Sequence, residues 1–186
     1  MRVTKEPEER RQEIIETAMR LFYEKGYEKT SIADIAKAIG VAQGLCYRYF
    51  PSKEALFDCT VDQYAQTLAD RLTPPADSLK RPLKEILGQM PMDTEADGSV
   101  FYQVFHEADN KKFHDQLSLK VCEKLVPGVT AMLARARENG EIDIEDVETA
   151  ARFCVYGQLG ILLDGKIEAG EKAERIRKFL IYALRV

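Results

Sequence analysis

The sequence predicts an all-α fold, and three observations lead to this prediction. Apolar residues recur every three to four positions along most of the chain, which is the spacing of one face of an amphipathic helix. Several of these stretches have recognisable ends, such as Gly26 after the first and a capping-box pattern from Ser31 to Asp34 before the second. Alternation of apolar and polar residues, which would indicate strands, is nowhere sustained. We expect about nine helices, arranged as a short three-helix unit followed by a larger bundle.

The first four helices are expected in the N-terminal third of the chain. The first covers about residues 7–25, and its apolar stripe consists of Ile14, Ile15, Ala18, Leu21 and Phe22. The second and third are short, and the turn Gly40-Val41 separates them; we place them at about 31–39 and 42–50. The fourth begins at Ser52 and continues to about residue 72.

A break follows between residues 73 and 82, because Pro74, Pro75 and Pro82 cannot lie inside one long helix. The remaining helices are expected at about 78–90, 99–109, 112–138, 145–168 and 171–184. Pro127 lies inside the 112–138 stretch, where we expect a kink or a split. This organisation predicts two domains: residues 1–55 as a helix-turn-helix unit, and residues 56–186 as a larger helical bundle.

The composition is that of a soluble protein with a substantial core. Of the 186 residues, 45% are hydrophobic and 31% are charged, and the net charge is -4. No stretch approaches the ~20 apolar residues that span a bilayer, and the charged N-terminus lacks the apolar segment of a signal peptide. We therefore expect a cytoplasmic protein with no membrane partner. The acidity lies mostly downstream, since residues 1–57 contain ten Lys and Arg against nine Asp and Glu.

Patterns typical of enzymes are absent from the sequence, which has no nucleophile–base motif and no Gly-rich phosphate loop. One polar run could be read as a set of metal ligands: His106, Glu107, Asp109, His114 and Asp115. The same run is as polar as a solvated helix end, which is the interpretation that we favour. We expect no enzymatic activity, no metal and no cofactor.

Four cysteines are scattered along the chain without a Cys-x-x-Cys pair: Cys46, Cys59, Cys122 and Cys154. This spacing argues against a structural zinc site and against a disulfide framework. The simplest interpretation is that they are buried, reduced thiols.

The segment from Ser31 to Phe50 has the spacing of a helix-turn-helix, in which the second helix lies in the major groove of DNA. The residues at the N-terminal end of that helix would face the bases; they are Ala42, Gln43, Gly44 and Leu45. Gln43 can donate and accept hydrogen bonds at once, as bidentate reading of adenine requires, and Leu45 suits the methyl group of thymine. Gly44 has no side chain, so the backbone can approach closely.

Around this tip we expect side chains that contact phosphate, which fix the position of a protein on DNA without reading its sequence. The candidates are Thr30, Ser31, Tyr47, Arg48, Tyr49 and Lys53. Lys53 lies in the first turn of the fourth helix, where free backbone N–H groups also favour an anion. Cys46 and Phe50 fall on the opposite face of the third helix and should be buried. The alternative is a purely structural bundle whose Tyr and Lys residues are only solvated.

The stretch AMRLFYEKGYEKTSIADIAKAIGVAQGLCYRYFPSKEALF resembles the tetracycline-repressor (TetR) family of transcriptional regulators. The positions that match the family pattern are Tyr27, Thr30, Ile35, Ala36, Ala38, Gly40, Val41, Gly44, Tyr47, Phe50, Lys53 and Leu56. The resemblance covers about residues 10–60. Two positions depart from it: Leu45 stands where Thr, Ser or Ala is more common, and Cys46 where Leu, Ile or Val is usual.

The resemblance implies a small-molecule pocket in the larger bundle and a homodimer formed by the last two long helices. Pocket candidates combine apolar bulk with a few polar tips: Tyr64, Met90, Phe101, Phe105, His106, Cys122, Phe153 and Tyr156. Dimer candidates form an apolar stripe that must be covered: Ala151, Cys154, Val155, Leu162, Ile176, Phe179 and Leu180. Coverage of that stripe within one chain is the alternative.

The function that the resemblance implies is regulation of transcription. We expect a sequence-specific regulator that binds a double-stranded DNA operator as a homodimer, and a repressor that an unknown small-molecule effector releases. The alternatives are a thiol-responsive regulator of the same fold, using Cys46 or Cys59, and a protein that interacts with partners other than DNA.

Overall fold

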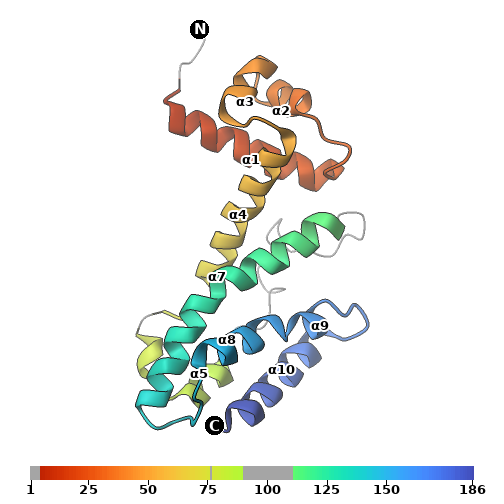
Figure 1. Ribbon diagram of the computed structural model, residues 1–186. Coiled ribbons are helices and arrows are strands. Elements are labelled where there is room, and N and C mark those ends of the chain that lie inside the picture. The colour runs from red at the N-terminus through yellow and green to blue at the C-terminus, as the bar shows by residue number, and fades with distance from the viewer. Residues whose placement is uncertain (1–4, 76, 90–110) are drawn as a thin grey trace. The chain divides into compact units, whose positions relative to one another are not determined.

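The computed structural model describes residues 5–75, 77–89 and 111–186, and in these residues the only regular structure is helical (Figure 1). The predicted all-α class is therefore confirmed. The elements are α1 (Pro7–Lys25), α2 (Ile32–Ala38), α3 (Gln43–Tyr49), α4 (Lys53–Leu72), the 3₁₀ helix η1 (Ser78–Lys80), α5 (Leu83–Gln89), α7 (Lys111–Glu138), α8 (Val147–Tyr156), α9 (Leu159–Leu162) and α10 (Ala169–Leu184). The helix predicted at 99–109 lies outside the described residues.

The chain divides into two compact units. The first contains α1, α2, α3, α4 as far as Tyr64, and the start of α7 as far as Leu117. The second contains the rest of α4 and α7 together with the remaining helices. The helix-turn-helix segment expected within residues 1–55 lies inside the first unit.

The core of the first unit is formed by the apolar stripe of α1, which is buried as the sequence predicts. Beside it, Phe22 and Phe57 meet edge to face with their ring centroids 5.4 Å apart. The capping box of α2 is also present: the Ser31 hydroxyl accepts from the Asp34 N–H at 3.2 Å, and the Asp34 carboxylate accepts from the Ser31 N–H at 2.9 Å. Local sequence thus fixes where α2 begins.

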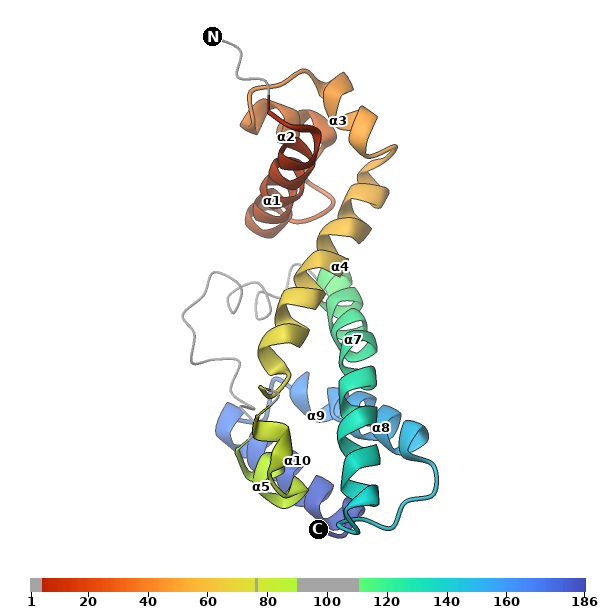
Figure 2. The same cartoon turned by 90° about the vertical axis from the view of Figure 1, so that its left-hand side faces the viewer.

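The second unit is built around one apolar cluster to which α5, α7, α8 and α10 all contribute (Figure 2). Its buried members are Leu83, Ile86, Leu87, Met132, Leu133, Ala136, Ile142, Ala151, Ile176, Leu180 and Leu184. A smaller cluster of Cys122, Val126 and Val155 lies between α7 and α8. These helices are amphipathic, and burial of their apolar faces holds the unit together.

Of the two outcomes predicted at Pro127, a kink or a split, the split is absent: α7 continues across Pro127 and bends part-way along its length (Figure 1). The helix predicted at 145–168 needs correction, because it is interrupted: α8 ends at Tyr156 and is capped by Gly157, whose N–H donates to the Phe153 carbonyl at 2.9 Å. Short α9 and a loop follow before α10 begins.

The stretch predicted as one helix at 78–90 is also divided, into η1 and α5, because Pro82 stands between them and cannot continue a helix. None of the helices that the structure describes is long and apolar enough to cross a membrane.

Candidate nucleic-acid interface

The turn between α2 and α3 depends on Gly40. This residue has φ +72°, a conformation that residues with a Cβ rarely adopt. The turn is closed by two backbone hydrogen bonds, from Gly40 N–H to the Lys37 carbonyl at 3.2 Å and from Val41 N–H to the Ala36 carbonyl at 2.9 Å. The geometry that directs α3 away from α2 is therefore built into the backbone.

One face of α3 is buried and the other is exposed. Cys46 and Phe50 are buried, as the sequence predicts, and they attach the helix to the rest of the unit. Ala42, Gln43 and Gly44 are exposed at the N-terminal end, and Leu45 is half-buried. The four residues predicted to face bases thus form a continuous tip that solvent, or DNA, can reach.

Gly44 has no structural reason to be glycine within this chain. It lies inside a helix, its φ is not positive, and a Cβ added to it would meet no atom within 4 Å. Glycine in a helix interior is less favourable than alanine by roughly 0.5–1 kcal/mol. A residue that weakens a seven-residue helix without relieving any internal contact is compatible with a close approach from outside the chain.

The predicted phosphate contacts Tyr47, Arg48 and Tyr49 follow the tip on the same helix. Tyr47 is 47% exposed, a large value for an aromatic residue, and Arg48 is also exposed. Tyr49 is half-buried. Hydroxyl and guanidinium groups at such positions can donate to phosphate oxygens without reading the base sequence.

Lys53, the first residue of α4, is held by an aromatic ring. Its ammonium nitrogen lies 4.1 Å from the ring centroid of Tyr27, which belongs to the turn between α1 and α2. Ser52 caps α4, its hydroxyl accepting from the Ala55 N–H at 3.0 Å. Tyr27 is a residue of this site that the sequence predicts only as part of the family pattern, and its position directly after Gly26 is the local signal for its role.

The structure corrects the prediction for Thr30. This residue is buried, and its hydroxyl lies 3.0 Å from the Leu21 carbonyl oxygen and 2.9 Å from that of Gly26. It therefore fastens the turn to the end of α1 and is not available to phosphate. Ser31 is exposed, but its hydroxyl and its N–H both serve the capping box with Asp34. These hydrogen bonds lower the pKa of the Asp34 carboxyl, so the carboxylate stays charged at neutral pH.

The pocket candidates are only partly described by the structure. Met90, Phe101, Phe105 and His106 lie outside the described residues, and so does most of the His106–Asp115 run. Cys122 is buried, and the half-buried Tyr156 packs against the same cluster. Tyr64 is buried in the first unit.

Phe153 does not fit the pocket interpretation, because it is 76% exposed on the outer face of α8. A shallow cavity of about 660 Å³ lies at the C-terminal end of α10, between Lys178 and Val186, and none of the predicted pocket residues lines it. Across the residues for which a structure is given, no three His, Cys, Asp or Glu side chains gather as metal ligands would.

The dimer candidates separate into two groups. Ala151, Val155, Ile176 and Leu180 are buried in the chain's own core, so they cannot form a surface and the prediction for them is corrected. Cys154 is half-buried against the same core. Leu162 and Phe179 are exposed. Exposed aromatic residues that the stripe missed are Phe153 and Tyr182, the latter 80% exposed.

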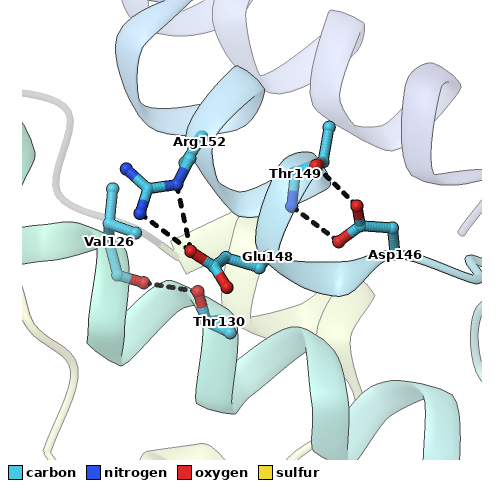
Figure 3. Close-up of polar contacts among 6 residues, drawn as sticks. All are labelled: Val126, Thr130, Asp146, Glu148, Thr149 and Arg152. Carbon is cyan, nitrogen blue, oxygen red and sulfur yellow. Dashed lines mark hydrogen bonds and ion pairs between the residues drawn. The ribbon is translucent and has the colours of Figure 1, made fainter.

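Ion pairs lie beside these exposed aromatic residues. On α8, Asp146 caps the helix by accepting from the Thr149 N–H at 3.0 Å, and Arg152 donates to Glu148 at 2.8 Å (Figure 3). On α10, Arg175 pairs with Glu171 at 2.5 Å. Apolar side chains bordered by charged ones are the usual anatomy of a protein–protein interface.

The geometry of the first unit defines a class of protein. A short helix, a glycine turn and a second helix with a bare exposed tip and cations around it constitute a helix-turn-helix DNA-binding module. The family model described as bacterial regulatory proteins, tetR family, matches residues 14–59, the segment that carries this module. The matched segment is thus the helix-turn-helix of the tetR family, and the chain that carries it is a DNA-binding transcriptional regulator.

Individual relatives agree with this assignment. The chain is 28% identical over 165 residues to the helix-turn-helix transcriptional regulator TtgR of Pseudomonas putida, an alignment that spans 81% of this chain and 77% of TtgR. It is 51% identical over 51 residues to the uncharacterised regulator YuxN of Bacillus subtilis, but this match spans 27% of the chain and 18% of YuxN. The solved structure of Salmonella enterica GusR shares the fold, with a TM-score of 0.68 at 24% identity over 98% of both chains.

Proposed function

We propose that this chain is a homodimeric repressor that binds an operator through α3 and leaves it when a small molecule binds. The observation that carries the proposal is the tip of α3, where Gly44 leaves the backbone uncovered for no internal reason. Gln43 at this tip would read adenine and Leu45 a thymine methyl group. Tyr47, Arg48 and Lys53 would contact phosphates, and Tyr49 would do so through its hydroxyl.

A second copy of the chain would complete the site. Half-sites read by a helix-turn-helix dimer are about 34–36 Å apart on one face of DNA, a distance that one α3 cannot span. The surface that supports a dimer consists of Phe153, Leu162, Phe179 and Tyr182, with the ion pairs of α8 and α10 around it. Aromatic residues are enriched at the centre of protein–protein interfaces, which is why these exposed side chains support a dimer.

Helix α4 supports the link between effector and DNA. It begins with Lys53 in the first unit and ends at Leu72 in the second, so one continuous helix belongs to both. An effector that binds more tightly to a state with α4 displaced would move Lys53 and α3 out of register with the grooves. Operator affinity would then fall by the ratio of the effector's affinities for the two states.

DNA binding is tested with the wild-type chain and a labelled duplex from the region upstream of its own gene. We expect the dissociation constant to increase steeply between about 50 and 200 mM salt, because cations on the protein replace counterions on DNA. Absence of binding, or binding that does not respond to salt, would contradict the proposal. Release of the duplex by small molecules is then screened at one fixed salt concentration.

A thiol-responsive version of the same function has one specific observation in its favour. The Arg11 guanidinium lies 3.1 Å from the Cys59 sulfur, and Cys59 is only half-buried. Cys46 is a weaker candidate, because burial raises the pKa of its thiol. Operator affinity measured before and after mild peroxide distinguishes the thiol-responsive regulator from the effector-responsive one. Unchanged affinity excludes the thiol mechanism. Affinity that falls in wild type but not in Cys59→Ala supports it.

A further inference from the structure

Tyr27 lies at the centre of an aromatic cluster that joins the turn after α1 to α4. Its ring centroid is 4.5 Å from that of Phe57 and 5.6 Å from that of Phe22, and both phenylalanines are fully buried. These contacts hold the Tyr27 ring in one orientation. The Lys53 ammonium lies 4.1 Å from the centroid of this fixed ring.

A ring is a different kind of partner for a lysine than a carboxylate would be. The face of the ring attracts the ammonium through its quadrupole, yet it does not neutralise the positive charge. The N–H donors that point away from the ring also stay available, because the ring holds the ammonium from one side only. Lys53 forms no ion pair within the described part of the chain, although Glu54 follows it directly.

Fixing a lysine before it binds also reduces the entropy lost on binding. Its flexible four-carbon stem makes a phosphate contact costly when the side chain is free in solution. A side chain that is already extended over a rigid ring loses less freedom when phosphate arrives, and binding is correspondingly tighter.

We propose that Tyr27 is a positioning residue for DNA binding, which holds the Lys53 ammonium extended, charged and ready to donate to a backbone phosphate. This inference rests on the proposed function and adds to it a residue that does not itself contact DNA. The groups that face Tyr27 support this role. Glu28, Glu54 and Asp58 are the carboxylates whose charges act on Tyr27, and none of them forms an ion pair with Lys53 in the described part of the chain.

The experiment is a double-mutant cycle on the full chain, with anisotropy of a labelled duplex as readout. The duplex is the tightest binder selected from a random library, so that no operator needs to be assumed. We expect Lys53→Ala to reduce affinity and to lower the salt slope by about 1, as loss of one phosphate contact does. Tyr27→Leu should weaken binding about two- to fivefold, and Tyr27→Phe, which keeps the ring, should bind like wild type.

The decisive comparison is Tyr27→Leu in the Lys53→Ala background, where we expect no further loss of affinity. A matched control is Tyr23→Leu, which removes a half-buried ring of α1 that is not one of the three rings of the cluster; its effect should be the same in both backgrounds. Equal losses from Tyr27→Leu with and without Lys53, or a Tyr27→Phe variant as weak as Tyr27→Leu, would overturn the inference. Wild type that selects no duplex would instead overturn the proposed function itself.

Discussion

At the residue scale, stability and DNA binding make opposite demands on Gly44. Alanine would stabilise the short helix α3 by roughly 0.5–1 kcal/mol, because alanine loses less conformational freedom than glycine when the chain folds. Space inside the chain allows the substitution, because an added Cβ meets nothing within 4 Å. If DNA approaches the backbone here, the same methyl group would be trapped between α3 and the base edges.

We therefore expect Gly44→Ala to raise the unfolding free energy and to weaken operator binding by about tenfold, equivalent to ~1.4 kcal/mol. Urea unfolding and DNA titration on the same sample measure the two effects. Gly128→Ala is the matched control, because Gly128 also lies inside a helix with open space around it. That variant should gain stability and keep its affinity for DNA. A Gly44→Ala protein that binds operator as tightly as wild type would show that DNA does not come close at this position.

Gln43 and Tyr47 have different predicted roles, and they can be distinguished by specificity. Gln43→Ala should relax the preference at particular base pairs by about 1–3 kcal/mol each, because a bidentate contact to a base is lost. Tyr47→Phe should weaken binding to all duplexes alike, since only a hydroxyl donor to phosphate is removed. Selection from a random duplex library with each variant measures both preferences. Uniform weakening by both substitutions would rule out Gln43 as a base reader.

Residue types alone could not assign every one of these roles. The exposure of Gln43 and Gly44 follows from the spacing of α3, because Cys46 and Phe50 fix which face is buried. The phosphate contact predicted for Thr30 was wrong. A threonine before a helix can cap it, contact phosphate or, as here, hydrogen-bond to the preceding helix. The choice is made by three-dimensional contacts to Leu21 and Gly26, which no local pattern encodes.

At the element scale, Glu141 joins the start of α5 to the end of α7. Its carboxylate accepts from the Leu83 N–H at 2.5 Å, and Arg135 from α7 donates to the Arg81 carbonyl at 2.7 Å. The hydrogen bond from Leu83 is the main cause of a lowered pKa for Glu141, with Asn139 and Arg135 adding to it. An otherwise unsatisfied N–H at the first turn of α5 is thus paired by a charged acceptor.

The lowered pKa of Glu141 determines how the stability of the fold depends on pH. A carboxyl whose pKa is lower in the folded than in the unfolded chain stabilises the fold above the unfolded value, here 4.5, and this stabilisation is lost as the pH falls through the folded pKa. We expect Glu141→Ala to cost about 1–3 kcal/mol at neutral pH and to have a smaller effect in acid. Urea unfolding at several pH values measures it.

Glu123→Ala provides the comparison, because Glu123 is paired with Lys120 on the exposed surface of α7. Surface pairs of this kind contribute about 0–1 kcal/mol, so the variant should unfold much like wild type. A Glu141→Ala protein as stable as Glu123→Ala at neutral pH would show that this carboxylate does not stabilise the junction of α5 and α7.

Helices were predictable where local signals agreed with packing. The apolar stripe of α1 and the capping box of α2 are purely local, and both were placed correctly. The division of the 145–168 stretch was missed because Gly157 and Gly160 are each tolerable in a helix, so no local signal in the sequence ends the helix at Tyr156. At Pro127 the sequence left a kink and a split open, and α7 continues across the residue because a long helix can accommodate one proline by bending.

At the scale of the whole molecule, it is difficult to predict from sequence which face of a helix is buried when the helix is apolar on two faces. The inner face of α10 carries Ile176 and Leu180, and the outer face carries Phe179 and Tyr182. A stripe read from sequence mixes these faces, because adjacent residues on a helix differ by about 100° in direction. Only the folded core shows which face the chain buries by itself and which one it leaves exposed.

The exposed face gives the last prediction, that a charge at its centre separates the subunits. Phe179→Glu should increase the dimer dissociation constant by at least about 30-fold, because a buried aromatic anchor at an interface contributes ~2 kcal/mol or more. It should hardly change the unfolding temperature of the monomer, since Phe179 is 63% exposed within its own chain. Sedimentation equilibrium measures the association. Operator binding should be lost together with the dimer, because a single α3 reads only one half-site.

The matched control is Leu119→Glu, which changes an exposed apolar residue on α7 and should leave the protein dimeric. If Phe179→Glu and Tyr182→Glu both sediment as dimers like wild type, the second copy binds elsewhere on the chain.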